Sequence, residues 1–204
     1  NVEVGDTTGT DQSVAIHLKD GGQVSVLSHT SVKAGKNSIG IYGSTTLATI
    51  ENDAKVEVGD GGVGIYLTGN STLPTSSTLE YKYSGSNTGR GMGIIYNVAN
   101  STNGTNVNLV NSTGTTGGLI GIFANGGGTF TNSGSITGSS TEKDFGIISE
   151  NTNVNNSGNI TLGNASNPNN PNIGIYAKTN NDITNSGNIA VGDNAVGIYG
   201  YGVT

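Results

Sequence analysis

Cysteine is absent from this chain of 204 residues, and charged residues are scarce. Without cysteine the chain forms no disulfide and carries no thiolate, although this does not assign it to a reducing compartment. Charged residues make up 11% of the sequence, with 8 basic against 14 acidic, which gives a net charge of −6. Nucleic acids and anionic membrane surfaces attract clustered lysine and arginine, so we expect this chain to bind neither.

Long apolar runs are also missing. No run approaches the roughly 18 residues that a membrane-spanning helix needs, and the chain does not open on a charged segment followed by an apolar one. We therefore expect any targeting signal to have been removed or to lie outside this segment.

Bulky side chains are few, since 32% of the residues are apolar and 5% aromatic, whereas 35 are glycine. An ordinary globule of this length needs more bulk to fill a central core. A stack of repeated units needs less, because each unit buries a few side chains against its neighbours. Low hydrophobicity is typical of disordered chains, but a regular return of isoleucine argues against disorder here.

That return is an eightfold repeat of a small residue followed by isoleucine and preceded by an apolar residue. The small residues are Ala15, Gly40, Gly64, Gly93, Gly121, Gly146, Gly174 and Gly197. The isoleucines are Ile16, Ile41, Ile65, Ile94, Ile122, Ile147, Ile175 and Ile198. Successive copies lie about 26 residues apart on average, and a period of this size indicates stacked structural units.

Each repeat is predicted to be a strand. In the copy Val63-Gly64-Ile65-Tyr66-Leu67, strict alternation places the valine, isoleucine and leucine on one face and the glycine and tyrosine on the other. A glycine kept in a strand indicates that a neighbouring side chain or backbone comes close. The aromatic residue two positions later is one candidate for that neighbour.

Two further short strands are predicted in each unit. The first group lies at 2–4, 24–26, 56–58, 81–83, 160–162 and 189–191. The second group ends in asparagine, at Asn52, Asn132, Asn156 and Asn185, and each of these follows a repeat glycine at a nearly constant distance. We expect the four asparagines to form a ladder, since an amide can bond to the same amide one unit above and below.

Three short strands in each unit do not fit successive hairpins, which give no fixed return. Winding the chain as a coil places equivalent strands on one another and isoleucine on isoleucine. The sequence therefore predicts one all-β domain over 1–204, a parallel β-helix of about eight rungs and about 38 Å long. We expect it to be right-handed, as parallel crossovers strongly prefer.

At this point the residues resemble a known class. The run at 185–200 reads Asn-Ser-Gly-Asn-Ile-Ala-Val-Gly-Asp-Asn-Ala-Val-Gly-Ile-Tyr-Gly, and the run at 156–163 repeats its first half. This resembles the repeat of type V autotransporter passenger domains, in particular the large fusobacterial outer-membrane adhesins. The resemblance implies a β-helix displayed on the bacterial cell surface and anchored in the outer membrane through a domain not present here. The chain would then be a fragment of a longer passenger and would contact the rest of that passenger.

Two features are candidates for recognition. The aromatic residues two positions after the repeat glycine offer ring faces to sugars or to partner side chains, with simple packing over the glycine as the alternative; the candidate ligand contacts are Tyr42, Tyr66, Phe123, Tyr176 and Tyr199. Unit length varies most before the repeat glycine, so loops 28–38, 84–91, 139–144 and 163–172 are predicted to project along one edge, either as recognition loops or as tolerated insertions.

Catalysis is the competing hypothesis, because many β-helices cleave polysaccharides with grouped carboxylates. Glu3 and Glu57 are expected at equivalent strand positions two rungs apart, with Ser25 between them. Their neighbours favour ordinary cross-strand charge pairs instead: Lys55, Glu80 and Lys82. Polysaccharide turnover that Glu57→Gln abolishes would favour an enzyme.

The other chemistry-bearing residues are isolated. His17 and His29 lie apart with no serine or aspartate constellation, and Arg90 is the single arginine. We therefore predict no enzyme activity, no cofactor and no metal. The expected role is a surface adhesin or stalk, associated with cell adhesion and virulence, whose partners are host or bacterial surface glycans or proteins.

Overall fold

The structure is a computed structural model that describes residues 1–8, 11–44, 47–50, 54–69, 73, 78–83, 90–111, 118–138, 143–179 and 181–202. Of residues 47–50, 78–83 and 111 only the backbone is considered. Within these ranges every regular element is a β-strand. All of the strand pairings between them are parallel, which confirms the predicted parallel β-helix.

Two eight-stranded sheets run the length of the molecule. Sheet A comprises β1 (Val2–Val4), β4 (Ser31–Ala34), β7 (Lys55–Val58), β9 (Thr78–Tyr83), β12 (Asn106–Asn111), β15 (Ile136–Gly138), β18 (Ile160–Leu162) and β21 (Ile189–Val191). Sheet B comprises β2 (Val14–Leu18), β5 (Ile39–Ser44), β8 (Val63–Thr68), β10 (Gly91–Asn97), β13 (Leu119–Ala124), β16 (Phe145–Glu150), β19 (Ile173–Lys178) and β22 (Val196–Tyr201). Sheet B is therefore the predicted eightfold repeat.

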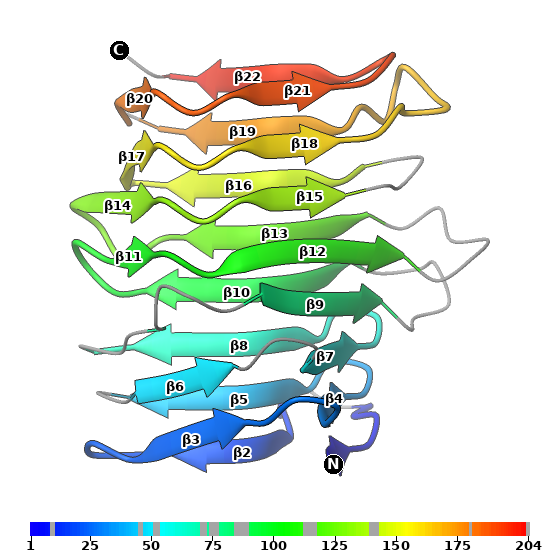
Figure 1. Cartoon of the computed structure of the whole chain (residues 1–204), viewed down its shortest axis with the longest axis vertical. Helices are drawn as coiled ribbons and strands as arrows, with labels where there is room; N and C mark the ends of the chain where they lie inside the picture. Colours follow the sequence, from blue (N-terminus) through cyan, green and yellow to red (C-terminus); the bar gives the residue numbers. More distant parts are fainter. Residues whose placement is uncertain are drawn as a thin grey trace.

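The third strand of the coil is divided between two small sheets. One pairs β3 (Gln23–Val26) with β6 (Leu47–Ile50), and the other runs through β11 (Thr102–Asn103), β14 (Thr129–Asn132), β17 (Asn153–Asn156) and β20 (Ile183–Asn185). As the chain climbs in Figure 1, it runs rightward along the nearer strands of sheet A and leftward along those of sheet B. This is the predicted right-handed sense.

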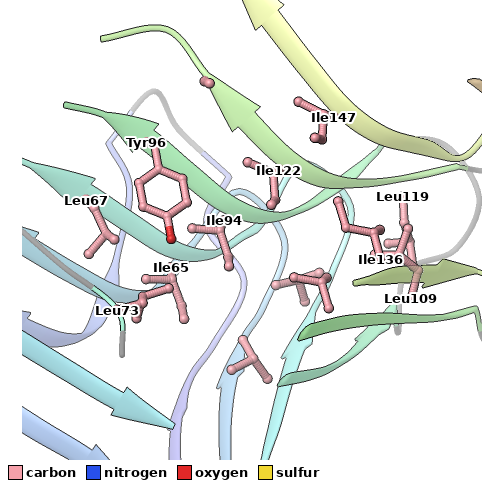
Figure 2. Packing of buried hydrophobic residues seen from close by; sticks show 14 of the residues in the cluster. Ile65, Leu67, Leu73, Ile94, Tyr96, Leu109, Leu119, Ile122, Ile136 and Ile147 are labelled. Carbon is pink, nitrogen blue, oxygen red and sulfur yellow. The ribbon is translucent and has the colours of Figure 1, made fainter. Parts of the chain in front are cut away.

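The interior is a column of isoleucine on isoleucine. The sheet B register joins Ile16, Ile41, Ile65, Ile94, Ile122, Ile147, Ile175 and Ile198 in that order. The six between the two ends are fully buried. Sheet A supplies the opposing layer, and Figure 2 shows Leu109 and Ile136 facing this column. Each rung thus buries a few apolar side chains against the next, as the low hydrophobic content requires.

The predicted alternation is wrong at the repeat glycine. Val63 and Tyr66 pack together in an outer cluster, whereas Ile65 and Leu67 lie in the main core. The side-chain position of the glycine points inward: at Gly40 a Cβ would lie 2.6 Å from the Gly64 carbonyl oxygen and 3.1 Å from Val32 Cγ1. Two consecutive residues therefore face the interior, and the side-chain phase shifts by one at each glycine. The close neighbour is backbone, so the interpretation that a ring covers the glycine is also wrong.

One predicted strand belongs to a different sheet. The sequence pattern groups residues 24–26 with the strands of sheet A, but they lie in β3, which pairs with β6. The sheet A strand of this rung is β4, which pairs with β1 and β7 and lies inside the predicted loop 28–38. Val32 and Ala34 are its buried residues. The sequence pattern also misses two sheet A strands, β12 and β15.

The asparagine ladder is confirmed for three of its four predicted members, and Asn52 lies outside the described residues. Asn103, Asn132, Asn156 and Asn185 share one register position in β11, β14, β17 and β20. The Nδ2 of each of the first three donates to the Oδ1 of the next asparagine at 2.7 to 2.8 Å. All four also donate to the carbonyl oxygen two residues ahead at 2.8 to 2.9 Å. Asn103 was missed because Ser101 stands two positions before it, where each predicted member has an apolar residue.

Tyr96 closes the lower end of this ladder. Its side chain is fully buried against the Phe130 ring, 5.2 Å away between centroids, and its hydroxyl donates to Asn103 Oδ1 at 3.0 Å. We expect Tyr96→Phe to lower the free energy of unfolding by about 1–2 kcal/mol, because the buried amide oxygen of Asn103 loses its donor. Urea unfolding of both proteins measures the difference, and equal midpoints would contradict the assignment.

The same hydroxyl predicts a pH effect. Burial raises the pKa of Tyr96 well above its usual value. A raised pKa means that the neutral phenol stabilises the fold below pH about 10, and that this contribution is lost as the unfolded chain ionises above that pH. Tyr96→Phe should therefore lose less stability than the parent protein between pH 9 and 11, approximately.

Candidate functional site

The five predicted contact residues lie in one line on the outer face of sheet B. We call this line the outer aromatic column; it contains His17, Tyr42, Tyr66, Ile95, Phe123, Ile148, Tyr176 and Tyr199 in successive rungs. Most of these side chains are half-buried, whereas His17 and Tyr199 are exposed. This placement follows from alternation after the inward isoleucine, which turns the next residue outward.

A second line runs beside the first. The outer apolar column consists of the residues before each repeat glycine: Val14, Ile39, Val63, Met92, Ile120, Phe145, Ile173 and Val196. Ile39, Val63 and Ile95 form a buried cluster to which Tyr42 and Tyr66 also pack. The sequence interpretation placed this line in the core, so the extent of apolar surface on the outer face was missed.

Ring-on-ring packing occupies part of the aromatic column. Tyr42 and Tyr66 stack with centroids 5.5 Å apart and planes at 19°, and Tyr176 and Tyr199 stack at 5.4 Å and 1°. Each stacked pair turns one face of each ring toward the other, and further rings pack on Tyr42 (His17) and on Tyr176 (Phe145). The three inner tyrosines remain partly exposed, and this exposed part is what a ligand can contact. The Tyr66 hydroxyl also accepts a hydrogen bond from Asn97 Nδ2 at 3.2 Å. Packing and recognition are therefore compatible in the same column.

A groove opens at the N-terminal end of this face. Its volume is about 480 Å³, and it is lined by Gln12, Val14, His17, Lys19, Ile39, Tyr42 and Ser44. The His17 ring meets the Tyr42 ring edge-on, with centroids 5.0 Å apart and planes at 85°. Of the predicted contact residues only Tyr42 lines this groove. The polar groups around it come from two neighbouring rungs, at 12–19 and 39–44, and their spacing in the sequence does not indicate a site.

Arg90 packs on the outer apolar column. Its guanidinium carbon lies 4.7 Å from the centroid of the Phe145 ring, an arrangement that favours a cation over the ring face. Burial lowers the pKa of Arg90, and the nearby Asp144 carboxylate opposes that shift. Asp144 is buried, and its Oδ1 accepts a hydrogen bond from the Leu119 amide at 2.8 Å. Arg90 thus ties sheet B rungs together.

The two carboxylates of the enzyme hypothesis are separated by an ammonium group. Lys33, not the expected Ser25, stands between Glu3 and Glu57 in the sheet A register. Its Nζ lies 2.8 Å from Glu3 Oε1, and that carboxylate raises the pKa of Lys33 through the hydrogen bond and its charge. Lys55 aligns with Glu80, and Glu57 aligns with Lys82. The backbone register therefore sets residues of opposite charge beside one another, which is the cross-strand arrangement that the sequence predicts.

The structure describes only some of the predicted loops. Residues 84–89 and 139–142 lie outside the described part of the chain. The segment 163–172 is a loop between β18 and β19, and it lies at the right-hand edge of Figure 1. Asn172 fixes its end, because its Nδ2 donates to the Gly163 carbonyl at 2.9 Å and its Oδ1 accepts from the Asp144 amide at 2.9 Å. This loop is held in place by the scaffold.

The comparisons with known proteins add no relative. No family model, no curated protein and no solved structure matches this chain. In the ranges given above, no helix is long and apolar enough to cross a membrane. Those same residues contain no group of three or more histidine, cysteine, aspartate or glutamate side chains placed to hold a metal ion.

Proposed function

We propose that this chain is a surface-displayed adhesive segment of an autotransporter passenger, and that it mediates attachment to host cells or to other bacteria. The observation that carries the proposal is the outer aromatic column, which places a ring at one register position in six of the eight rungs of sheet B, with isoleucine in the other two. The partners are surface glycans or proteins. The proposal assigns no catalysis, cofactor or metal to this segment.

The geometry supports attachment by many weak contacts. Neighbouring rungs lie about 4.8 Å apart, so a ligand that lies along the rod meets several rings at once. Linked weak sites bind far more tightly than any one of them, because each contact after the first is intramolecular. A stiff scaffold favours this mechanism, since it keeps the contacts in line before the ligand arrives.

Two rungs of the repeat show which residue can replace an aromatic ring in this column. Isoleucine occupies the same slot at Ile95 and Ile148, so Tyr66→Ile and Tyr176→Ile remove aromatic edges and hydroxyls without changing the backbone requirement. We expect the double variant to bind cells at least about tenfold more weakly in an attachment assay and to lose signals on a glycan array. Its thermal unfolding should stay close to that of the parent.

Tyr201→Ile is the matched control. Tyr201 is 64% exposed on β22 but pairs with Lys178, outside the aromatic column. Its replacement should leave attachment unchanged. Equal binding by the parent protein and the double variant would refute the aromatic column as the adhesive surface. If the parent protein showed no attachment at all, the adhesive function would be refuted, and the segment would act as a stalk.

A further inference from the structure

The groove at the N-terminal end of the outer face combines the features of a sugar site. Val14 and Ile39 line it with apolar side chains, and Tyr42 lines it with an aromatic ring. Gln12 and Ser44 are uncharged polar residues in the same lining. A volume of about 480 Å³ lies within the range of small-molecule sites. A pyranose has the matching character, since its C–H face packs on apolar and aromatic surface while its hydroxyls need hydrogen-bonding partners.

The charged residue in the groove indicates the charge of the ligand. Lys19 is the one lysine, arginine, aspartate or glutamate among the residues that line this groove. Its Nζ lies 3.9 Å from Asp20 Oδ2, and both side chains are largely exposed (74% and 81%), so this ion pair is weak and leaves the ammonium accessible. Lys33 and Lys178, in contrast, are closer to their carboxylates, at 2.8 Å and 3.3 Å. The chain as a whole carries a net charge of −6. Within this groove, however, the accessible ammonium of Lys19 lies in the same lining as the Tyr42 ring, and this combination favours an anionic ligand.

We propose that this groove binds a carboxylated sugar residue of a surface glycan. The C–H face of the sugar packs on Tyr42 and Ile39, and its hydroxyls bond to Gln12 and Ser44. The carboxylate pairs with the Lys19 ammonium as a charge-assisted hydrogen bond. His17 stands at 5.0 Å from Tyr42 between ring centroids and bounds the same space. This inference rests on the proposed adhesive function and names the glycan class that one end of the face recognises.

Titration of the isotope-labelled chain with methyl β-D-glucuronide tests the site by NMR. We expect shifts at His17 and Tyr42 with a dissociation constant on the order of millimolar, and much smaller shifts with methyl β-D-glucoside, which lacks the carboxylate. Lys19→Gln should weaken glucuronide binding by about fivefold or more, and Lys19→Arg should restore most of it. Lys178→Gln, the same change on β19, should have no effect.

Three outcomes would overturn the proposal. Equal shifts with glucoside would remove the role of the carboxylate, equal shifts with N-acetyl-aspartate amide would indicate an acidic peptide site, and no shift at His17 or Tyr42 would exclude the groove. Cell attachment separates this failure from failure of the adhesive function. If Lys19→Gln attaches to cells normally while the Tyr66 and Tyr176 double variant does not, the groove proposal fails and the adhesive function stands.

Discussion

Gly146→Ala is expected to destabilise the coil by about 3 kcal/mol or more, because the added methyl group has no space. Its Cβ would lie 2.6 Å from the Gly174 carbonyl oxygen and 2.9 Å from Ile160 Cγ2. The carbonyl belongs to the next rung of sheet B, and the isoleucine belongs to sheet A. Relief of the first contact requires the paired strands β16 and β19 to separate, and relief of the second requires the buried Ile160 side chain to move. The free energy of unfolding from urea titration is the measurement.

Gly197→Ala is the matched control, since it makes the same change at the same repeat position in the last rung. The nearest atom to its Cβ would be Ile189 Cγ2 at 3.8 Å, an ordinary contact. We expect its stability to stay within about 0.5 kcal/mol of the parent. A similar loss in both variants would show that intrinsic strand propensity, and not the approach of the next rung, selects glycine.

Asn132→Leu is expected to cost about 3–5 kcal/mol, because it interrupts the asparagine ladder in the middle. The Asn132 amide donates to Asn156 Oδ1 at 2.7 Å and to the Gly134 carbonyl at 2.8 Å, and it accepts from Asn103 Nδ2 at 2.8 Å. Leucine has a similar volume but leaves three buried groups without their partner. Thermal or urea unfolding measures the loss.

Asn185→Leu provides the comparison. Asn185 closes the upper end of the ladder in an exposed position, where water replaces the lost bonds. We expect this variant to lose about 1 kcal/mol or less. If Asn132→Leu were no worse than Asn185→Leu, the ladder would add no more than local turn bonds.

The repeat itself was predictable because one residue type returns at one position. Ile65 on Ile94 follows from the period alone, since a coil whose turns are of similar length must stack equivalent residues. Asn132, Asn156 and Asn185 were also predictable. Each is followed by Ser-Gly, and the spacing from the repeat glycine is nearly constant.

The exchange of β3 and β4 was not predictable from the local pattern. Residues 24–26 read Val-Ser-Val, which matches the sheet A strands Val2–Val4 and Lys55–Val58 better than Ser31–Ala34 does. Both segments can form a strand. Their sheet is decided by which neighbouring rung they meet, namely β6 for β3, and β1 and β7 for β4.

Part of the candidate site was also predictable from the sequence, and part was not. The alignment of Tyr42, Tyr66, Phe123, Tyr176 and Tyr199 follows from the repeat. The outward position of the residue before each glycine does not, because alternation in an ideal strand places it inside. The glycine faces inward beside the carbonyl of the next rung, and this is a contact between residues about one coil apart, which local alternation does not contain. The groove likewise requires Gln12 and Ser44 from neighbouring rungs.

Methyl–methyl contacts in a sample labelled only at isoleucine δ1 groups test the stacked coil most directly. The account predicts one continuous chain of NOE cross-peaks that links Ile16, Ile41, Ile65, Ile94, Ile122, Ile147, Ile175 and Ile198 in that order. Methyls two rungs apart should give much weaker peaks, because about 9.6 Å separates them. Strong peaks between non-adjacent members, or no peaks between adjacent ones, would contradict the parallel β-helix.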